Sequence, residues 1–133
     1  MEKLIQTIVK NNKIHYYKKI TYGKRYKKIE YFYDILENNE PIKTFCHNIK
    51  NPAVIVYSNN KIIRLEYWVK GQLHRDYKPA IIILNDNKIS DEIWYQNNVK
   101  LTDDEVEQIK KTIDRRLKIL NILYKTKLKK VGT

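Results

Sequence analysis

Two histidines and their neighbours are the first candidates for catalytic residues in this sequence. His47 directly follows Cys46, and Asp76 lies two positions after His74. An imidazole is the usual general base in proteins, and a thiol beside it could become a reactive thiolate. Neighbours along a strand point to opposite faces, however, so Cys46 is expected to be a half-buried structural thiol. The histidines also lack a nucleophile, a second acid or a metal cluster nearby, and we therefore predict no catalytic residue and no enzyme activity.

Metal and phosphate chemistry also lacks the residues that it requires. The three histidines, at positions 15, 47 and 74, and the single cysteine have no local partners at the spacing of metal ligands. There is no glycine-rich phosphate loop and no nucleophile elbow. We expect no metal and no cofactor. A single cysteine is also typical of a reducing compartment.

The two histidines belong to a repeat of 27 residues. The stretch HNIKNPAVIVYSNNKI at 47–62 aligns with HRDYKPAIIILNDNKI at 74–89, and seven of the 16 aligned positions are identical. A fixed internal period indicates that each unit is one supersecondary element, which buries its apolar face only against its neighbours. The His...Pro-Ala segment is therefore interpreted as part of a repeated fold.

A histidine that recurs at one place in each repeat is expected to make the same structural hydrogen bond in each. Arg75, which follows His74, has no counterpart at Asn48. The aromatic pairs Tyr67-Trp68 and Trp94-Tyr95 recur with the same offset, and we expect them to pack in the core or between hairpins. The residues predicted to be structural in the repeat are His47, Pro52, Trp68, Gly71, His74, Pro79 and Trp94.

Short β-branched runs separated by turn residues predict β-hairpins. The runs VIVY and IIIL are followed by turn clusters at 58–60 and 85–87. The same strand, turn, strand pattern occurs at 7–17 around Asn-Asn, and at 20–33 with Gly23 as the expected turn. We predict an α+β fold: an antiparallel β-hairpin repeat meander of about six to eight strands, closed by one long C-terminal helix.

The helix is predicted from its start signal and its periodicity. Thr102 is the expected N-cap, and Glu105 three residues later completes a capping box. Apolar residues then follow at three- and four-residue steps: Val106, Ile109, Ile113, Leu117, Leu120 and Tyr124. We predict one domain, with hairpin repeats at 1–101, a helix at 102–128 and a basic tail at 129–133. The apolar stripe packs either in the core or in a dimer seam, so the sequence does not decide whether the protein forms a homodimer.

One copy of the repeat resembles a known family. The stretch EYWVKGQLHRDYKPAIII at 66–83 contains an aromatic pair, a turn glycine, His-Arg and Pro-Ala in turn, and EIWYQNNVKLTDDE at 92–105 repeats the aromatic pair and the turn. This pattern is similar to the MORN-like hairpin repeats of large DNA viruses and phages, which read Trp-Tyr, Asn-Gly, Leu-His-Arg and Pro-Ala, and the resemblance covers residues 40–105. The resemblance implies an interaction module without enzymatic activity, in a viral protein of the host cytoplasm or the virion.

The net charge of +12 is concentrated at the two ends of the chain. Ile, Lys, Asn and Tyr are abundant, as in an AT-rich genome, so part of the lysine excess is codon bias. The charge is +7 over residues 1–30, −3 over 31–109 and +8 over 110–133. Such basic ends suit an acidic partner. With no apolar run of membrane-spanning length and no cleavage site, we expect a soluble intracellular protein.

Near the N-terminus, tyrosines interleave with lysines. Aromatic rings that stack on bases, beside cations that neutralise phosphates, are typical of surfaces that bind single-stranded nucleic acid. An edge hairpin kept soluble by its lysines has the same composition, and both interpretations stay open. The candidate nucleic-acid-binding residues are Lys18, Lys19, Tyr22, Lys24, Arg25, Tyr26, Lys27 and Lys28, with Lys110, Lys111, Arg115, Arg116 and Lys118 on the helix.

Two functions therefore compete for the same basic surface. The first is low-specificity binding of DNA or RNA through the N-terminal hairpins and the basic helix. The alternative is a MORN-like protein-interaction or scaffold module that binds an acidic protein partner, with the helix as a dimerisation element. Attachment to an anionic membrane ranks lower, because the helix has neither Trp nor Phe for interfacial insertion.

Overall fold

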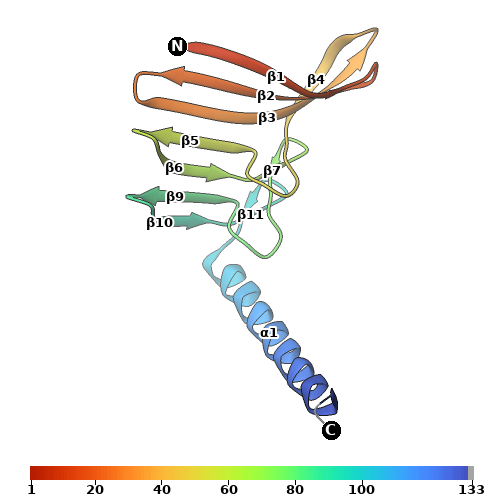
Figure 1. The fold of residues 1–133 in the computed structure, drawn as a ribbon, viewed down its shortest axis with the longest axis vertical. Helices are drawn as coiled ribbons and strands as arrows, with labels where there is room; N and C mark the ends of the chain where they lie inside the picture. Colours follow the sequence, from red (N-terminus) through yellow and green to blue (C-terminus); the bar gives the residue numbers. More distant parts are fainter. Residues whose placement is uncertain (132–133) are drawn as a thin grey trace. The chain divides into compact units, whose positions relative to one another are not determined.

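The computed structural model describes the backbone of residues 1–131 and the side chains of residues 1–127. The chain divides into two compact units, residues 1–100 and residues 101–133. The first unit is built from twelve β-strands, and the second contains one α-helix (Figure 1). The prediction of an α+β fold made of antiparallel hairpins and one C-terminal helix is confirmed.

Eight strands form one antiparallel sheet, in the order β1-β2-β3-β5-β6-β9-β10, with β4 beside the second half of β3. These strands are β1 Glu2–Lys10, β2 Ile14–Gly23, β3 Tyr26–Glu37, β4 Glu40–Cys46, β5 Val54–Ser58, β6 Lys61–Glu66, β9 Ile81–Asn85 and β10 Lys88–Ile93. Two small hairpins follow β6 and β10: β7 Trp68–Val69 with β8 Gln72–Leu73, and β11 Tyr95–Gln96 with β12 Val99–Lys100. The turns of β2–β3, β5–β6 and β9–β10 lie at one end of the sheet (Figure 1).

Most hairpins close with two-residue turns in which both central residues have positive φ, the geometry of type I′ turns. These turns are Asn38-Asn39, Asn59-Asn60, Lys70-Gly71, Asp86-Asn87 and Asn97-Asn98. The turn clusters predicted at 58–60 and 85–87 are therefore confirmed. The expectation for Gly23 was wrong: Gly23 ends β2, and Lys24-Arg25 form the turn, with Arg25 at a φ of 62°.

The alanine of each Pro-Ala segment joins the strands of its own repeat through its N–H and accepts a bond from the preceding repeat through its carbonyl. The Ala53 N–H donates to the Glu66 carbonyl at 2.8 Å, and the Ala80 N–H donates to the Ile93 carbonyl at 2.9 Å. Both alanines have no exposed surface, and the following Val54 and Ile81 are also buried. Only a small side chain fits here, because the strands of two units approach closely at this point.

A third repeat unit precedes the two that sequence comparison identifies. The Tyr31 N–H donates to the Ala53 carbonyl at 2.8 Å, just as the Tyr67 N–H donates to the Ala80 carbonyl at 2.8 Å. Glu30-Tyr31-Phe32 thus occupies the place of Glu66-Tyr67-Trp68. The second half of β3 and β4 replace the small hairpin β7–β8, which lengthens this unit by nine residues and hides it from a fixed 27-residue offset.

The described part of the sheet has a thin core. Buried apolar residues are few, and no large side chain is fully buried. A polar cluster supports the first unit instead: the buried Asp34 carboxylate accepts from the Tyr17 hydroxyl at 3.0 Å and from the Thr44 hydroxyl at 2.8 Å. Burial, reinforced by Asp34, raises the pKa of Tyr17 to about 12. Tyr17 is therefore structural.

Helix α1 spans Asp103–Val131 and begins with the predicted capping box. The Glu105 N–H donates to the Thr102 hydroxyl at 3.2 Å, and the Thr102 N–H donates to the Glu105 carboxylate at 3.0 Å. The helix ends three residues beyond the expected boundary at 128, and positions 132–133 of the predicted basic tail lie outside the described residues. Within residues 1–131, no helix has the length and apolar character needed to cross a membrane.

Gly71 offers a direct test of the turn geometry. Its φ is 76°, and a Cβ built on it would lie 2.9 Å from Cδ1 of Phe45. We expect Gly71→Ala to lower the free energy of unfolding by about 1–3 kcal/mol, because it adds left-handed strain and a ring contact. Urea unfolding followed by circular dichroism measures this.

The matched control is Gly23→Ala, whose Cβ would meet only the flexible Met1 Cε at 3.4 Å and the Tyr26 Cβ at 3.5 Å. We expect a change within about 0.5 kcal/mol for this variant. Equal losses in the two variants would contradict the assigned role of the Gly71 turn.

Candidate functional site

The two histidines hold the turns of the small hairpins by the same hydrogen bond. The Lys70 N–H donates to Nδ1 of His47 at 2.9 Å, and the Asn97 N–H donates to Nδ1 of His74 at 3.1 Å. Because Nδ1 accepts in both rings, the proton of each neutral imidazole sits on Nε2. Each histidine therefore satisfies a turn N–H that would otherwise have no protein partner.

The residue after each histidine also has a repeated role, which corrects the view that Arg75 has no counterpart. The Asn48 side chain donates to the Pro52 carbonyl at 3.2 Å, and the Arg75 guanidinium donates to the Pro79 carbonyl at 3.3 Å. The Arg75 guanidinium also lies 3.8 Å from the ring centroid of Tyr67. Amide and guanidinium donors thus close the same loop, although the sequence alignment shows no similarity between them.

The pair of His74 and Asp76 is engaged in the fold. Nε2 of His74 lies 2.9 Å from Oδ1 of Asp76, while Nδ1 accepts from the backbone. Both ring nitrogens therefore have partners within the sheet unit, one in the same loop and one in the β11–β12 turn. Cys46 is also unsuited to nucleophilic chemistry, since burial, followed by the charges of Glu30 and Glu66, raises its thiol pKa to about 12. Within the described residues, no three His, Cys, Asp or Glu side chains gather where they could hold a metal ion.

Strand alternation divides the N-terminal candidates between the two faces of the sheet. Residues directly opposite each other on neighbouring strands share a face. Tyr22 is paired with Lys27, and Lys27 in turn with Tyr57 on β5, so these three side chains share one face. Lys19 is paired with Glu30 on the opposite face. The candidates therefore do not form one continuous surface.

Lys28 shares the face of Lys19 and takes part in an ion pair. Its Nζ lies 3.5 Å from the Glu30 carboxylate. Arg64 and Glu66 form the equivalent ion pair in the next unit. The repetition indicates that Lys28 is a structural cation of the repeat, and Lys18 and Lys19 also lie away from the β2–β3 turn.

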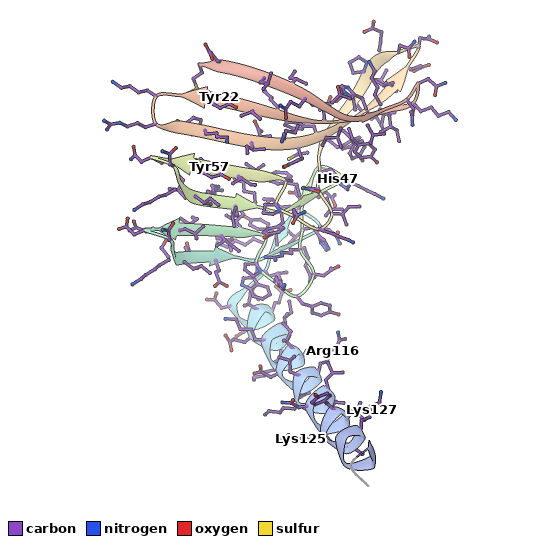
Figure 2. The ribbon with its side chains drawn as sticks, viewed as in Figure 1. Tyr22, His47, Tyr57, Arg116, Lys125 and Lys127 are labelled. Carbon is purple, nitrogen blue, oxygen red and sulfur yellow. The ribbon has the colours of Figure 1, made fainter. Side chains whose placement is uncertain are left out.

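Four of the predicted residues line a hollow at the end of the sheet where the turns lie. This hollow of about 350 Å³, which we name the turn-end hollow, is lined by Tyr22, Gly23, Arg25, Tyr26, Lys27, Tyr57 and Asn60. The Asn59 N–H donates to the Arg25 carbonyl at 2.9 Å, which ties the β5–β6 turn to the β2–β3 turn. Nζ of Lys27 lies 5.3 Å from the Tyr57 ring centroid. Figure 2 shows Tyr22 on β2 and Tyr57 on β5.

Sequence reasoning missed Tyr57 as a member of this group. Its equivalent in the next repeat is Leu84, so the departure from the repeat was the available signal. Lys24 completes the site as the exposed first residue of the turn. The hollow thus brings the rings of Tyr22 and Tyr57 together with Lys27 on one face of the sheet, with Lys24 and Arg25 at the tip of the hairpin. Tyr26 also lines the hollow, but it is the strand neighbour of Lys27, so its side chain belongs to the opposite face.

The helix candidates lie on exposed positions of α1. Lys110 is 4.0 Å from the Glu107 carboxylate, a contact of helix neighbours three residues apart. Lys111, Arg115 and Lys118 are exposed. Arg116, labelled in Figure 2, belongs to the same stretch. Lys111, Arg115 and Lys118 lie on one side of α1, whereas Arg116 lies next to the apolar stripe.

No known protein family matches the chain, and neither does any curated protein or solved structure. The MORN-like resemblance therefore stays a prediction.

The His47 hydrogen bond predicts a pH dependence of stability. Burial, and then the charge of Lys70, lower the pKa of His47 below its ordinary value of 6.5. The unfolded chain then binds a proton more readily than the folded chain, so His47 destabilises the fold as pH falls below about 6.5. We expect the free energy of unfolding to fall less between pH 7.5 and 5.5 in His47→Gln than in the wild type, as measured by urea titration. Identical pH dependence in both proteins would contradict this role.

Proposed function

We propose that the protein binds single-stranded nucleic acid without catalysis, and that the turn-end hollow is the principal contact. The observation that supports this most is that Tyr22, Lys27 and Tyr57 share one face of the sheet and line one hollow, with Arg25 at the adjoining turn. Stacking on aromatic rings contributes about 1–3 kcal/mol per base and tolerates any sequence. The flanking cations neutralise the phosphates on either side of the stacked base.

The dimensions and exposure of the hollow suit this ligand. Its volume of about 350 Å³ lies at the small end of ligand sites, which range from roughly 300 to 1,000 Å³. Tyr22 is 39% exposed, so its ring is available to an incoming base. An unstacked base from a single strand can enter such a hollow, whereas a base inside a duplex cannot.

Specificity is expected to be low. Lysine outnumbers arginine 22 to 5 in the chain, and lysine acts as a point charge without the planar fork that reads base edges. A second contact is proposed on α1 through Lys110, Lys111, Arg115, Arg116 and Lys118. This contact adds charge neutralisation without base recognition, and it serves DNA and RNA alike.

Protein interaction is the second candidate function, and exposed apolar residues on β1 favour it. Ile5, Ile8 and Val9 are each more than half exposed on this edge strand. A second hollow, of about 410 Å³, lies between β1 and the loop after β4, and apolar and aromatic side chains dominate its lining. Unpaired edge strands with apolar side chains are templates for strand addition by another chain.

Fluorescence anisotropy with labelled single-stranded and double-stranded oligonucleotides tests the nucleic-acid proposal. We expect tighter binding to the single strand, with an affinity that falls steeply as salt increases. Tyr22→Leu and Tyr57→Leu keep the apolar volume but lose stacking, and each should weaken binding about tenfold. Lys24→Gln with Arg25→Asn removes two charges and should reduce the salt slope by roughly 1–1.5; Asn tolerates the positive φ of position 25.

The charge-matched control is Lys10→Gln with Lys43→Gln, on two exposed positions in β1 and β4. This control should leave the salt slope nearly unchanged. Equal losses in both double variants would mean that only net charge matters, and the turn-end hollow would then not be the site. No binding at low salt would overturn the proposal and leave the β1 edge as the surface to test.

A further inference from the structure

Helix α1 carries an apolar stripe with a period of eleven residues. Val106, Ile109 and Ile113 recur, eleven positions on, as Leu117, Leu120 and Tyr124. Eleven residues in three turns correspond to about 3.67 residues per turn, close to an undistorted helix, so the stripe runs nearly along the helix axis. Leu117, Leu120 and Tyr124 are 58%, 60% and 62% exposed, while the first three stripe residues are half-buried.

The charges beside the stripe are arranged symmetrically about Arg116. Glu107 lies nine residues before Arg116, and Lys125 lies nine residues after it. Asp114 and Lys118 are each two residues away on opposite sides, and Glu105 and Lys127 are each eleven residues away. In a regular helix, Glu105, Asp114, Arg116 and Lys127 lie nearest the stripe, whereas Glu107, Lys118 and Lys125 turn further outward. Figure 2 shows Lys125 and Lys127 on the last turns of α1.

This symmetry is the pattern required by two identical antiparallel helices. In such a pair, residue positions equally far before and after the twofold axis face each other across the seam. With the axis near Arg116, each acid named above faces a lysine of the second copy. The same register places Ile113 opposite Leu120, and Ile109 opposite Tyr124, to within one residue. Charge and apolar residues thus select the same alignment independently.

We propose that α1 pairs in an antiparallel manner with α1 of a second copy of this chain, centred on Arg116. A parallel pair would align the basic C-terminal halves with each other, and would place the acidic first turns together. The stripe has cations on both flanks, and the helix has neither Trp nor Phe for interfacial insertion, which suits a helix seam better than a membrane-surface helix. The like-charged contact of Arg116 with its symmetry mate is the one unfavourable pair in this alignment.

The proposal stands apart from nucleic-acid binding, because it concerns the apolar stripe and is tested without any nucleic acid. If both are correct, one dimer carries two turn-end hollows and two sets of helix cations. Linked binding of two sites to one strand would then raise the affinity above that of either site. Failure of either proposal leaves the other intact.

Thiol cross-linking between two differently tagged full-length chains reads the orientation of the pair. In a Cys46→Ser background, one chain carries Glu105→Cys and the other carries Lys127→Cys, and a short bismaleimide is added to the mixture. We expect mixed cross-linked dimers to exceed both same-chain dimers by severalfold. Gln108→Cys in place of Glu105→Cys is the control, because residue 108 points away from the stripe, and it should give almost no mixed product.

Exchanging the charges at positions 107 and 125 tests the register of the helix pair. Sedimentation equilibrium measures the dimer dissociation constant of each variant. Lys125→Glu should raise the dimer dissociation constant about tenfold, because the twofold axis repeats each altered pair. Adding Glu107→Lys to the same chain should restore the wild-type value. Lys111→Glu makes the same change in net charge, but residue 111 faces Asn121 in this alignment, so it should have little effect.

The wild type is therefore expected to be a concentration-dependent dimer, and Leu117→Glu should make it monomeric while circular dichroism shows unchanged helix content. A wild type that stays monomeric at several hundred micromolar would overturn the proposal. Dominant same-chain cross-links would overturn it in favour of a parallel pair. A monomer that binds vesicles of anionic lipid would instead assign the stripe to a membrane surface.

Discussion

The hydrogen bond from a hairpin turn to a histidine ring is the interaction on which the sheet unit depends. His47 and His74 each lie in a loop that returns from one strand pair to the next, and each accepts from a turn 23 residues further along the chain. The alanine backbone bonds then join one unit to its neighbour. Because no large side chain is fully buried in the described residues, these repeated polar contacts define the geometry that a larger core would otherwise impose.

Function is expected where the chain departs from this repeated scaffold. The Lys24-Arg25 turn stands where the other sheet hairpins have Asn-Asn or Asp-Asn, and Tyr57 stands where the next unit has Leu84. The scaffold holds the turns of β2–β3 and β5–β6 together through the bond from Asn59 to Arg25. A repeated fold therefore supplies rigid positions, and a few substitutions at one end provide rings and cations for a ligand.

Local rules predicted the elements from sequence, since hairpin turns and the Thr102–Glu105 capping box depend on residues close together in the chain. Three features needed the structure. The first repeat unit was not found in the sequence because its hairpin is nine residues longer. Asn48 and Arg75 both donate to a proline carbonyl, but their side chains are chemically different, so the sequence does not reveal this shared role. The candidate cations form one surface only in part, because alternation along β2 and β3 sends Lys19 and Lys28 to the face opposite Lys27.

The turn-end hollow can be tested as a nucleic-acid-binding site by ultraviolet cross-linking of the full chain to a uniformly labelled single-stranded oligonucleotide. Mass spectrometry then identifies the peptides to which the oligonucleotide is attached. It identifies the residues that contact bases without altering the protein. The proposed site predicts that the dominant attachments fall on Tyr22 and Tyr57, the two rings that share a face in the turn-end hollow. Attachments confined to α1 or to the β1 edge, with these tyrosines unmodified, would contradict it.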